Sequence, residues 1–283
     1  MRRIVAVLIA IVAALGLGTT SAQAVTGNFV ADYEHEYVGL IVFYDGDGGY
    51  SHRCSGSLLT ETVFLTAGHC VTLDDAGTLA PAARVYFEQD VNDPATGAPF
   101  AGGVEAHTLH SYGFEGLGNL PQSRDVGLVI LDQPVTEVYP EIDTYASLGA
   151  AGTLDSYGTG IDAKVDLSGY GVQNANKNHP VESLERLTAA TFIIGGRNPR
   201  NNGGYNVQIA SNLGGGRGGA CFGDSGGPIL LAGTDVVVAV NSFVLNRNCA
   251  GQAYAYRTDL QAVISWILEH AGAESGEIEI VTV

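Results

Sequence analysis

One serine lies in a stretch that could present it as a nucleophile. Residues 221–228 (CFGDSGGP) surround Ser225 with residues that carry almost no side chain. Gly223 and Gly226 can adopt the positive φ angles that bulkier residues resist, and Pro228 removes a donor and disfavours a helix after the turn. The hydroxyl of Ser225 is therefore expected to be accessible beside bare backbone N–H groups. A serine hydroxyl alone is a weak nucleophile, so this chemistry needs a base and a group that orients the base.

Two other segments offer these partners. Residues 65–70 (LTAGHC) place His69 beside a cysteine and small residues at the end of an apolar strand. Asp125 begins the apolar segment 125–131 (DVGLVIL), an unexpected place for a purely solvated charge. A buried carboxylate needs a partner, and the N–H of an imidazole is a suitable one. Each residue taken alone also has an ordinary interpretation, as a structural histidine or a loop-end aspartate.

No metal or cofactor site is expected. His107 and His110 lie close together in the sequence, but two ligands make no site without a third, so we interpret them as residues of an ordinary strand and loop. Residues 45–49 (DGDGG) contain two aspartates but lack the later glutamate of a calcium loop. A plain turn is the expectation there.

The composition is that of an acidic protein with many turns. The 283 residues can form one large or two small cores, and 39 Gly beside 13 Tyr and one Trp favour an all-β protein. Thirteen Lys and Arg against 30 Asp and Glu give a net charge of −17. This charge argues against nucleic acid as a partner, because phosphates require basic surfaces.

The first 24 residues have the parts of a secretory signal. Arg2 and Arg3 precede an apolar run over residues 4–17, and the small residues Ala22 and Ala24 complete a site for cleavage after Ala24. A membrane anchor is the alternative, but it needs about 20 apolar residues, more than this run contains. The sequence therefore predicts a secreted, extracellular protein with no membrane attachment after cleavage.

The chain has four cysteines, which are expected to be oxidised in a secreted protein. They are Cys54, Cys70, Cys221 and Cys249. Four cysteines allow three pairings, and their spacing alone does not choose among these.

Short strands separated by turns account for most of the rest of the chain. β-Branched and apolar runs predict strands at residues 38–44, 165–172, 187–194, 205–209 and 235–240. Residues 134–153 lack a clear strand and are the expected crossover between two halves. This spacing of strands and turns is typical of barrels or a sandwich.

One helix is predicted, near the C-terminus, over residues 258–271. Thr258 and Gln261 form a capping box, and Gly272 provides a stop. A single apolar stripe runs along it through Leu260, Val263, Ile264, Ile267 and Leu268. The remaining residues, 272–283, are interpreted as a mobile tail.

With His69, Asp125 and Ser225 in this order, the sequence resembles the chymotrypsin-like (trypsin family) serine proteases, of the secreted bacterial type. The three motifs quoted above carry the resemblance, which extends from about residue 25 to residue 270. It implies an all-β fold of two packed six-stranded antiparallel β-barrels followed by a C-terminal α-helix. Residues 25–145 would form the first barrel, with His69 and Asp125, and residues 146–257 the second, with Ser225.

The resemblance also implies the role of each residue. Ser225 would attack a peptide carbonyl, His69 would carry the proton, and Asp125 would orient the imidazole. The amides of Gly223 and Ser225 would form the oxyanion hole. The substrates would be proteins or peptides and the enzyme a monomer. The implied disulfides are Cys54–Cys70 and Cys221–Cys249.

The residues implied for the specificity pocket argue against cleavage after Lys or Arg. Gly219, six positions before the serine, would form the pocket floor where a basic preference would need an aspartate. Ser242 and Val244 would line one wall, and the branched Val244 would narrow it toward apolar residues of small or medium size. The alignment leaves open whether Gly251 or Gln252 also lines the pocket. Two further departures from the family, Gly68 and Gly127 in place of alanine, are expected to thin the packing near the catalytic residues.

The resemblance further implies an activation pair. In the family a freed apolar N-terminus pairs with the aspartate before the nucleophile, here Asp224. Val25 would become that N-terminus directly after signal cleavage. The alternative is that Asp224 pairs with an internal arginine and the N-terminus is loose.

Two other functions remain open from the sequence. The motif around Ser225 also fits the nucleophile turn of an α/β-hydrolase esterase, but that fold needs a helix after the serine and a later histidine, where only His270 remains. A non-catalytic binding protein on a protease scaffold is the second alternative, because fold does not fix function.

Overall fold

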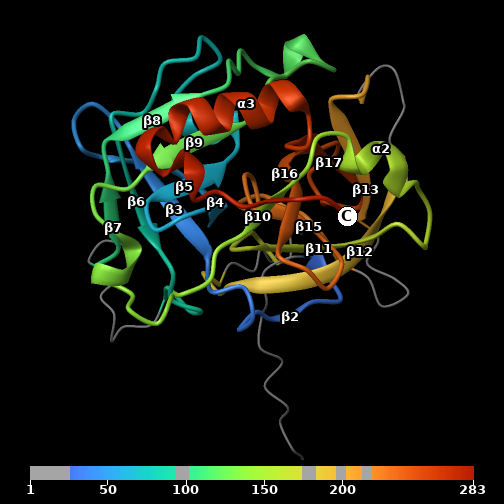
Figure 1. Cartoon of the computed structure of the whole chain (residues 1–283), viewed down its shortest axis with the longest axis horizontal. Helices are drawn as coiled ribbons and strands as arrows, with labels where there is room; N and C mark the ends of the chain where they lie inside the picture. Colours follow the sequence, from blue (N-terminus) through green and yellow to red (C-terminus); the bar gives the residue numbers. More distant parts are fainter. Residues whose placement is uncertain (1–25, 93–101, 174–182, 196–201, 212–217) are drawn as a thin grey trace, which may run out of the picture.

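A computed structural model of the chain describes residues 26–92, 102–173, 183–195, 202–211 and 218–283 (Figure 1). The predicted signal, residues 1–24, and Val25 lie outside these ranges. No helix in the part of the chain that the structure describes is long and apolar enough to cross a membrane.

The first half of the chain forms a nearly closed antiparallel barrel. Its strands follow the order β7-β6-β3-β4-β5-β9-β8. They are β3 (Val38–Tyr44), β4 (Tyr50–Leu58), β5 (Val63–Thr66), β6 (Ala82–Tyr86), β7 (Val104–Ala106), β8 (Thr108–Ser111) and β9 (Gly127–Ile130). The sheet has seven strands rather than six because β7 and β8 are separated at His107, whose Nδ1 lies 2.6 Å from Asp132 Oδ2. The turn predicted before β4 is present, with Asp45 Oδ1 accepting the N–H of Gly49.

The second half forms a closed barrel, because β15 pairs with β16 as well as with β11. Its six strands are β11 (Lys164–Gly169), β12 (Leu187–Gly195), β13 (Asn206–Ser211), β15 (Pro228–Leu231), β16 (Val236–Val244) and β17 (Gly251–Arg257). Two short strands extend this sheet, β2 (Val30–Ala31) on β12 and β10 (Ser147–Gly149) beside β16. Two others, β1 (Thr26–Gly27) and β14 (Gly218–Gly219), pair with each other in a separate two-stranded sheet. The predicted two-barrel fold is confirmed. The predicted crossover is not free of strands, since it contains β10.

The helices are short. They are α1 (Gly68–Val71), α2 (Thr153–Tyr157) and α3 (Gln261–His270), with 3-10 turns η1 (Leu117–Asn119), η2 (Val135–Glu137) and η3 (Gly272–Gly276). The predicted capping box is wrong: α3 begins after Leu260 without a side-chain cap, and the Thr258 hydroxyl donates to the carbonyl of Val237 instead. Gly272 does adopt a positive φ, of 60°, where the helix ends.

Helix α3 follows the second barrel but packs on the first. Val263 and Ile267 belong to the hydrophobic core of the first barrel, and Figure 1 shows α3 lying along β8 and β9. The rings of Tyr112, which follows β8, and Trp266 of α3 lie 5.4 Å apart. The chain therefore returns from the second barrel to the first before it ends.

The residues after α3 are ordered, so the prediction of a mobile tail is wrong. Ile278 is buried in a hydrophobic cluster formed mainly by the first barrel, and Val281, on strand β18 (Ile280–Val281), packs against the core of the second. Strand β18 pairs in parallel with β10. The carboxylate of Glu274 also accepts hydrogen bonds from the hydroxyls of Thr60 and Thr62. The tail therefore connects the two barrels.

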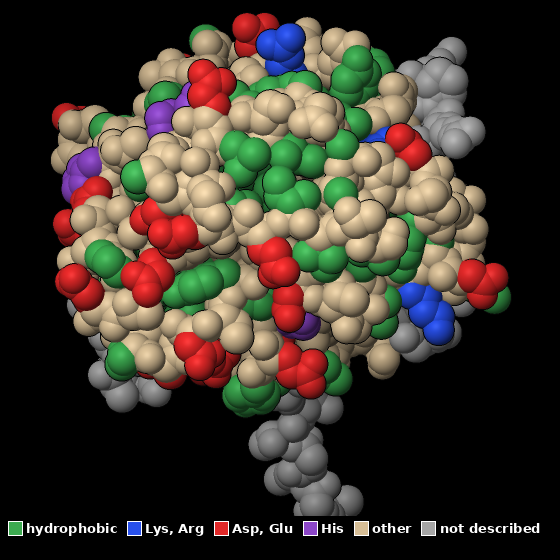
Figure 2. Space-filling view, viewed as in Figure 1, with side chains coloured by type: hydrophobic (Ala, Val, Ile, Leu, Met, Phe, Trp, Pro, Cys, Tyr) green, Lys and Arg blue, Asp and Glu red, His purple; other side chains and the backbone are tan. Residues whose placement is uncertain are grey.

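The surface is acidic, as the composition requires. Figure 2 shows Asp and Glu side chains scattered over the face seen in Figure 1, with few Lys or Arg among them. This distribution gives no basic patch on that face that phosphates would need.

Replacing Ile278 tests the docked tail. Because Ile278 is 6% exposed, Ile278→Ala is expected to lower the free energy of unfolding by about 2 kcal/mol. Ile280, two residues later, is 41% exposed, so Ile280→Ala should change it by less than about 0.5 kcal/mol. Denaturant unfolding of both variants makes the comparison, and equal effects would contradict the docking.

Candidate active site

A cavity of about 420 Å³ brings several of the predicted site residues together from both barrels. The first barrel contributes His69, Thr72, Leu73, Asp74, Asp75, Phe114 and Leu117. The second contributes Ala220, Cys221, Phe222, Ser225, Asn241, Ser242, Phe243, Val244 and Tyr254. The predicted base and the predicted nucleophile therefore line one space, although 156 residues separate them in the sequence.

His69 and Asp125 form a hydrogen-bonded pair at the edge of this cavity. His69 Nδ1 lies 2.9 Å from Asp125 Oδ2 and 3.1 Å from Oδ1, and the His69 backbone N–H donates to Oδ1 at 2.7 Å. The Asp125 side chain is fully buried, whereas that of His69 is 27% exposed. The short helix α1 therefore positions both donors of His69 toward one carboxylate.

The electrostatics of the pair favour the charged form of each partner. Burial opposes a charged His69, but the negative charge of Asp125 and the hydrogen bond to it outweigh burial, so the pKa of His69 is raised. Burial likewise opposes a charged Asp125, but His69 and the hydroxyl of Ser242 outweigh it and lower the pKa of Asp125. The carboxylate is thus held ionised beside an imidazole that binds protons readily.

Ser242 has a contact that the sequence reasoning missed. It was predicted as part of a specificity wall, and it does line the cavity, but its hydroxyl donates to Asp125 Oδ2. This bond joins strand β16 of the second barrel to the acid of the first. A short-range pattern could not predict it, because 117 residues separate the two side chains.

The turn around Ser225 has the backbone that its glycines predict. Gly223 and Gly226 have φ angles of 95° and 78°. A Cβ on Gly226 would lie 2.0 Å from Thr66 Oγ1, so only glycine fits there. The Ser225 carbonyl accepts the N–H of Ser55 at 2.8 Å, which anchors the turn to β4.

The donors of this turn remain unused. Neither the N–H of Gly223 nor that of Ser225 donates to an acceptor among the described residues. In the same part of the structure no hydrogen bond joins Ser225 Oγ to His69 Nε2; the contact of Nε2 is Cys70 Sγ, at 3.7 Å. Such bonds are often long without substrate.

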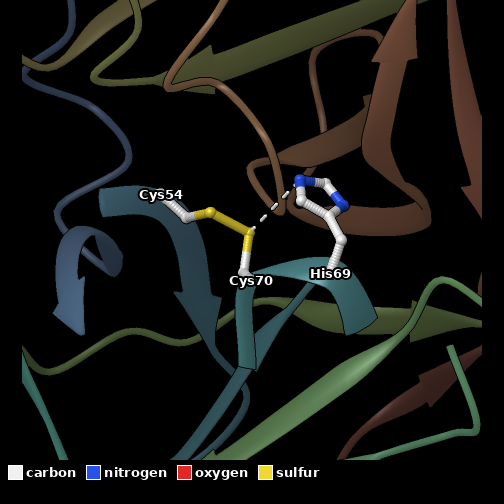
Figure 3. A group of neighbouring side chains, drawn as sticks. All are labelled: Cys54, His69 and Cys70. Atoms are coloured by element: carbon white, nitrogen blue, oxygen red, sulfur yellow. Dashed lines mark hydrogen bonds between the residues drawn. A yellow bond between two sulfur atoms is a disulfide. The ribbon is translucent and has the colours of Figure 1, made fainter. Parts of the chain in front are cut away.

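Both predicted disulfides are present. Cys54–Cys70 lies directly beside His69 (Figure 3), and Cys221–Cys249 joins the loop that carries Ser225 to the loop after β16. Cys54, His69 and Cys70 are also the one group of three metal-type ligands found among the described residues. Their two sulfurs are bonded to each other, so neither is available as a thiolate.

Gly68 and Gly127 do not thin the packing, contrary to expectation. A Cβ on Gly68 would lie 2.9 Å from Phe114 Cβ, and one on Gly127 would lie 2.5 Å from the carbonyl oxygen of Ala67. The neighbouring atoms already occupy the space that an alanine would take. These glycines therefore permit close contact between α1 and the strand that follows Asp125.

Asp224 points away from the cavity into the protein. Its carboxylate accepts the N–H of Gly171 at 2.9 Å and that of Cys221 at 2.8 Å. Burial raises its pKa to about 7, although these two bonds and the charge of Arg53 act in the opposite direction. Its predicted partner Val25 lies outside the described residues.

The predicted pocket residues are only partly brought together. Val244 lines the cavity, but Gly219 does not; it lies in β14, paired with Thr26. Neither Gly251 nor Gln252 lines the cavity. Tyr254 does, and its ring stacks on that of Phe243 at 4.6 Å. The alternation along β17 could have indicated Tyr254 once the strand was recognised.

The fold and this cavity define a chymotrypsin-like protein of two β-barrels. A family model described as Trypsin matches residues 24–267, which is most of the chain. The chain belongs to the trypsin family, whose members related to it are serine endopeptidases.

Relatives from several animals match over most of their length. A fibrinolytic enzyme, isozyme C, of Lumbricus rubellus is 28% identical over 78% of this chain and 89% of its own. Chymotrypsin-like elastase family member 1 of Homo sapiens is 26% identical over 79% of this chain and 83% of its own. Trypsin alpha of Drosophila melanogaster is 24% identical over 79% of this chain and 79% of its own. These relatives are eukaryotic and do not support the expected bacterial type.

Solved structures show the same fold. The HL collagenase structure superposes with a TM-score of 0.66 and 20% identity, covering 88% of this chain and 98% of the other. A mutant of human heparin binding protein (CAP37) superposes with a TM-score of 0.62 and 18% identity, covering 88% of this chain and 97% of the other.

An NMR titration of the imidazoles tests the His69–Asp125 pair. His69 is expected to titrate above about 6.5, and His52, whose pKa burial lowers, below it. Asp125→Asn removes the negative charge, so the pKa of His69 should fall. The pKa of His110, which burial and His270 lower, serves as the internal control. An unchanged His69 pKa in the variant would contradict the pairing.

Proposed function

We propose that the protein is a secreted serine endopeptidase that hydrolyses peptide bonds through an acyl-enzyme intermediate. Ser225 is the nucleophile, His69 the general base and Asp125 the group that orients the base. The observation that carries the proposal is that His69, hydrogen-bonded to the buried Asp125, lines the same cavity as Ser225 in a chain of the trypsin family. No cofactor takes part.

The steps follow from the positions of the proton donors and acceptors. His69 Nε2 takes the proton of Ser225 as Oγ attacks the carbonyl, and Asp125 stabilises the imidazolium that forms. The unused N–H groups of Gly223 and Ser225 bind the oxyanion, an effect worth about 3 to 4 kcal/mol per donor in a comparable site. The imidazolium then protonates the leaving amine, and water, activated by the same base, releases the acyl group.

The lining of the cavity supports cleavage after apolar rather than basic residues. Val244, Phe243 and Tyr254 present branched or aromatic surface to the substrate. Asp125 and Asp224 are both buried and already accept hydrogen bonds, so neither is offered to a lysine or arginine side chain.

Two further aspartates, Asp74 and Asp75, line the first-barrel side of the cavity, where both are exposed to solvent. Against the second-barrel wall of Val244 and Phe243, a cation would lose its hydration without a paired charge, which is costly.

The two rival functions have less support. The esterase alternative needs a helix after the serine, but Ser225 is followed by strand β15 in an all-β fold. A binding protein on the same scaffold remains the second candidate, and one structural relative carries the name heparin binding protein. A net charge of −17 does not favour a polyanionic ligand of that kind here.

Secretion and a monomeric state complete the proposal. Trypsin-family relatives are typically extracellular, and the leader over residues 1–24 is consistent with export and cleavage after Ala24. The proposed enzyme acts as a monomer on proteins or peptides, without nucleic acid or a membrane.

A fluorophosphonate probe tests the catalytic assignment. In the mature protein Ser225 Oγ should attack the phosphorus of the probe, displace fluoride and become phosphonylated. Mass spectrometry of a digest identifies the labelled residue. Ser225→Ala should not react, and Asp125→Asn should react about 10⁴-fold more slowly, because the imidazole is no longer held in the required tautomer. Folded wild-type protein that is unlabelled would favour the binding-protein alternative.

We also propose that the ammonium group of Val25 pairs with Asp224 after signal cleavage. Thr26, the next residue, pairs with Gly219, two residues before Cys221. This contact brings the start of the described chain to the segment that carries Asp224. Burial has raised the pKa of Asp224 to about 7, so a full positive charge there would stabilise its ionised form. Pairing with Arg53 is the alternative.

Retaining one residue before Val25 tests this pair. Moving the ammonium group away leaves Asp224 without its charge partner, and activity should fall on the order of 100-fold. A free α-amine has a pKa of about 7.7–8.0, and pairing raises it. Where Asp224 is ionised, the contribution of the ammonium group is therefore complete below about pH 7.7 and is lost as the pH rises through the higher pKa of the amine in the folded protein. Full activity in the extended variant would overturn the pairing with Val25 and leave Arg53 as the partner.

A further inference from the structure

One polar atom in the cavity wall lacks a hydrogen-bond partner. Asn241, on β16, lines the cavity beside Ser225, yet it is only 3% exposed. Its Oδ1 is buried and accepts no hydrogen bond within the described part of the chain. Buried acceptors are almost always satisfied, so an unsatisfied one in a substrate cavity points to a donor that arrives with the substrate.

The orientation of the Asn241 amide is fixed by its other end. Nδ2 donates to the carbonyl of Gly227 at 3.3 Å, the same carbonyl that accepts the Asn241 backbone N–H at 2.9 Å. Exchanging the two amide atoms would place two oxygens against each other, so the assignment of Oδ1 follows from this bond. Oδ1 is therefore on the side of the amide that faces away from Gly227.

The neighbouring side chains do not supply the missing donor. The hydroxyl of Ser242 is committed to Asp125. Ala220, Val244 and the stacked face of Phe243 are apolar. Around Asn241 the wall is thus mostly apolar, with Oδ1 as a neutral acceptor whose hydrogen-bonding capacity is unused; Tyr254, which carries a hydroxyl, belongs to the same cavity lining.

We propose that Asn241 Oδ1 accepts a hydrogen bond from the substrate side chain that precedes the cleaved bond. The cavity then prefers a neutral side chain with an O–H or N–H donor over the side chain of the same shape without one, namely threonine over valine and tyrosine over phenylalanine. This inference rests on the proposed function and narrows its apolar preference. Lysine and arginine remain excluded, because one neutral acceptor does not compensate for burying a charge.

A site that binds a donor rejects the analogue lacking it, since the acceptor is then left unpaired. The test compares kcat/KM for two pairs of peptides that differ only before the cleaved bond, threonine against valine and tyrosine against phenylalanine. The wild-type enzyme should favour the donor in each pair that it cleaves by about 10-fold, which corresponds to about 1.4 kcal/mol. Asn241→Leu, which keeps the approximate volume but has no acceptor, should bring the ratio to about one or below.

Ser211→Ala is the matched control. The Ser211 hydroxyl is also buried without a partner, but it lies against Gly219 and does not line the cavity. Its removal should leave the ratios unchanged. If Asn241→Leu fails to fold, Asn241→Val provides a second variant, and wild-type ratios near one would overturn the inference without either.

The outcomes separate this inference from the proposed function. Labelling of Ser225 by the fluorophosphonate, measured on the same protein, establishes whether the enzyme assignment holds. If Ser225 is labelled and peptides are cleaved but both wild-type ratios are near one, Asn241 is satisfied by water and the inference is overturned. A preference that survives in Asn241→Leu would overturn it as well. If Ser225 is not labelled, the proposed function fails first.

Discussion

The buried carboxylate of Asp125 is the constraint on which the site depends. An ionised group without exposure must be surrounded by donors, and Asp125 receives three, from the backbone and ring of His69 and from the hydroxyl of Ser242. The first two come from the first barrel and the third from the second. Satisfying this one charge therefore fixes the base and also joins the two barrels at the cavity.

The C-terminal end of the chain also joins the two barrels. Helix α3 and the tail pass from the second barrel back over the first, where Ile267 and Ile278 enter its core. A cleft between two bodies keeps its geometry only if the bodies cannot rotate against each other. Glu274, bonded to Thr60 and Thr62, adds polar contacts to this apolar attachment. The ordered tail is thus part of what holds the cavity in shape.

The sequence predicted the features that depend on local pattern. Strand β3, the positive φ angles of Gly223 and Gly226 and the end of α3 at Gly272 are consequences of residue type within a few positions. The family motifs led to the disulfides and the barrels. The structure places two of the three predicted catalytic side chains, His69 and Ser225, in the lining of one cavity, with Asp125 buried behind His69 and hydrogen-bonded to it.

What the sequence missed depends on contacts between distant segments. The bond from Ser242 to Asp125, the unpaired amide of Asn241 and the docking of Ile278 leave no periodic signal, because each depends on what another part of the chain places nearby. The error at Gly68 has the same origin. The absent methyl group of Gly68 was interpreted as loose packing, whereas Phe114 and the backbone on either side of Asp125 occupy that space.

Two buried aspartates near one serine make the role of charge partners clear. Asp125 and Asp224 are both almost inaccessible, and burial raises the pKa of each. For Asp125 the adjacent imidazole outweighs burial, so the net pKa is lowered. For Asp224 the two amide donors and the charge of Arg53 do not outweigh burial, so the net pKa is raised to about 7. The imidazole and the Ser242 hydroxyl thus compensate for the burial of Asp125 more fully than these groups do for Asp224. If the ammonium group of Val25 pairs with Asp224, that carboxylate gains its charge partner only when the leader has been removed. The turn that carries the oxyanion donors would then be stabilised only after export.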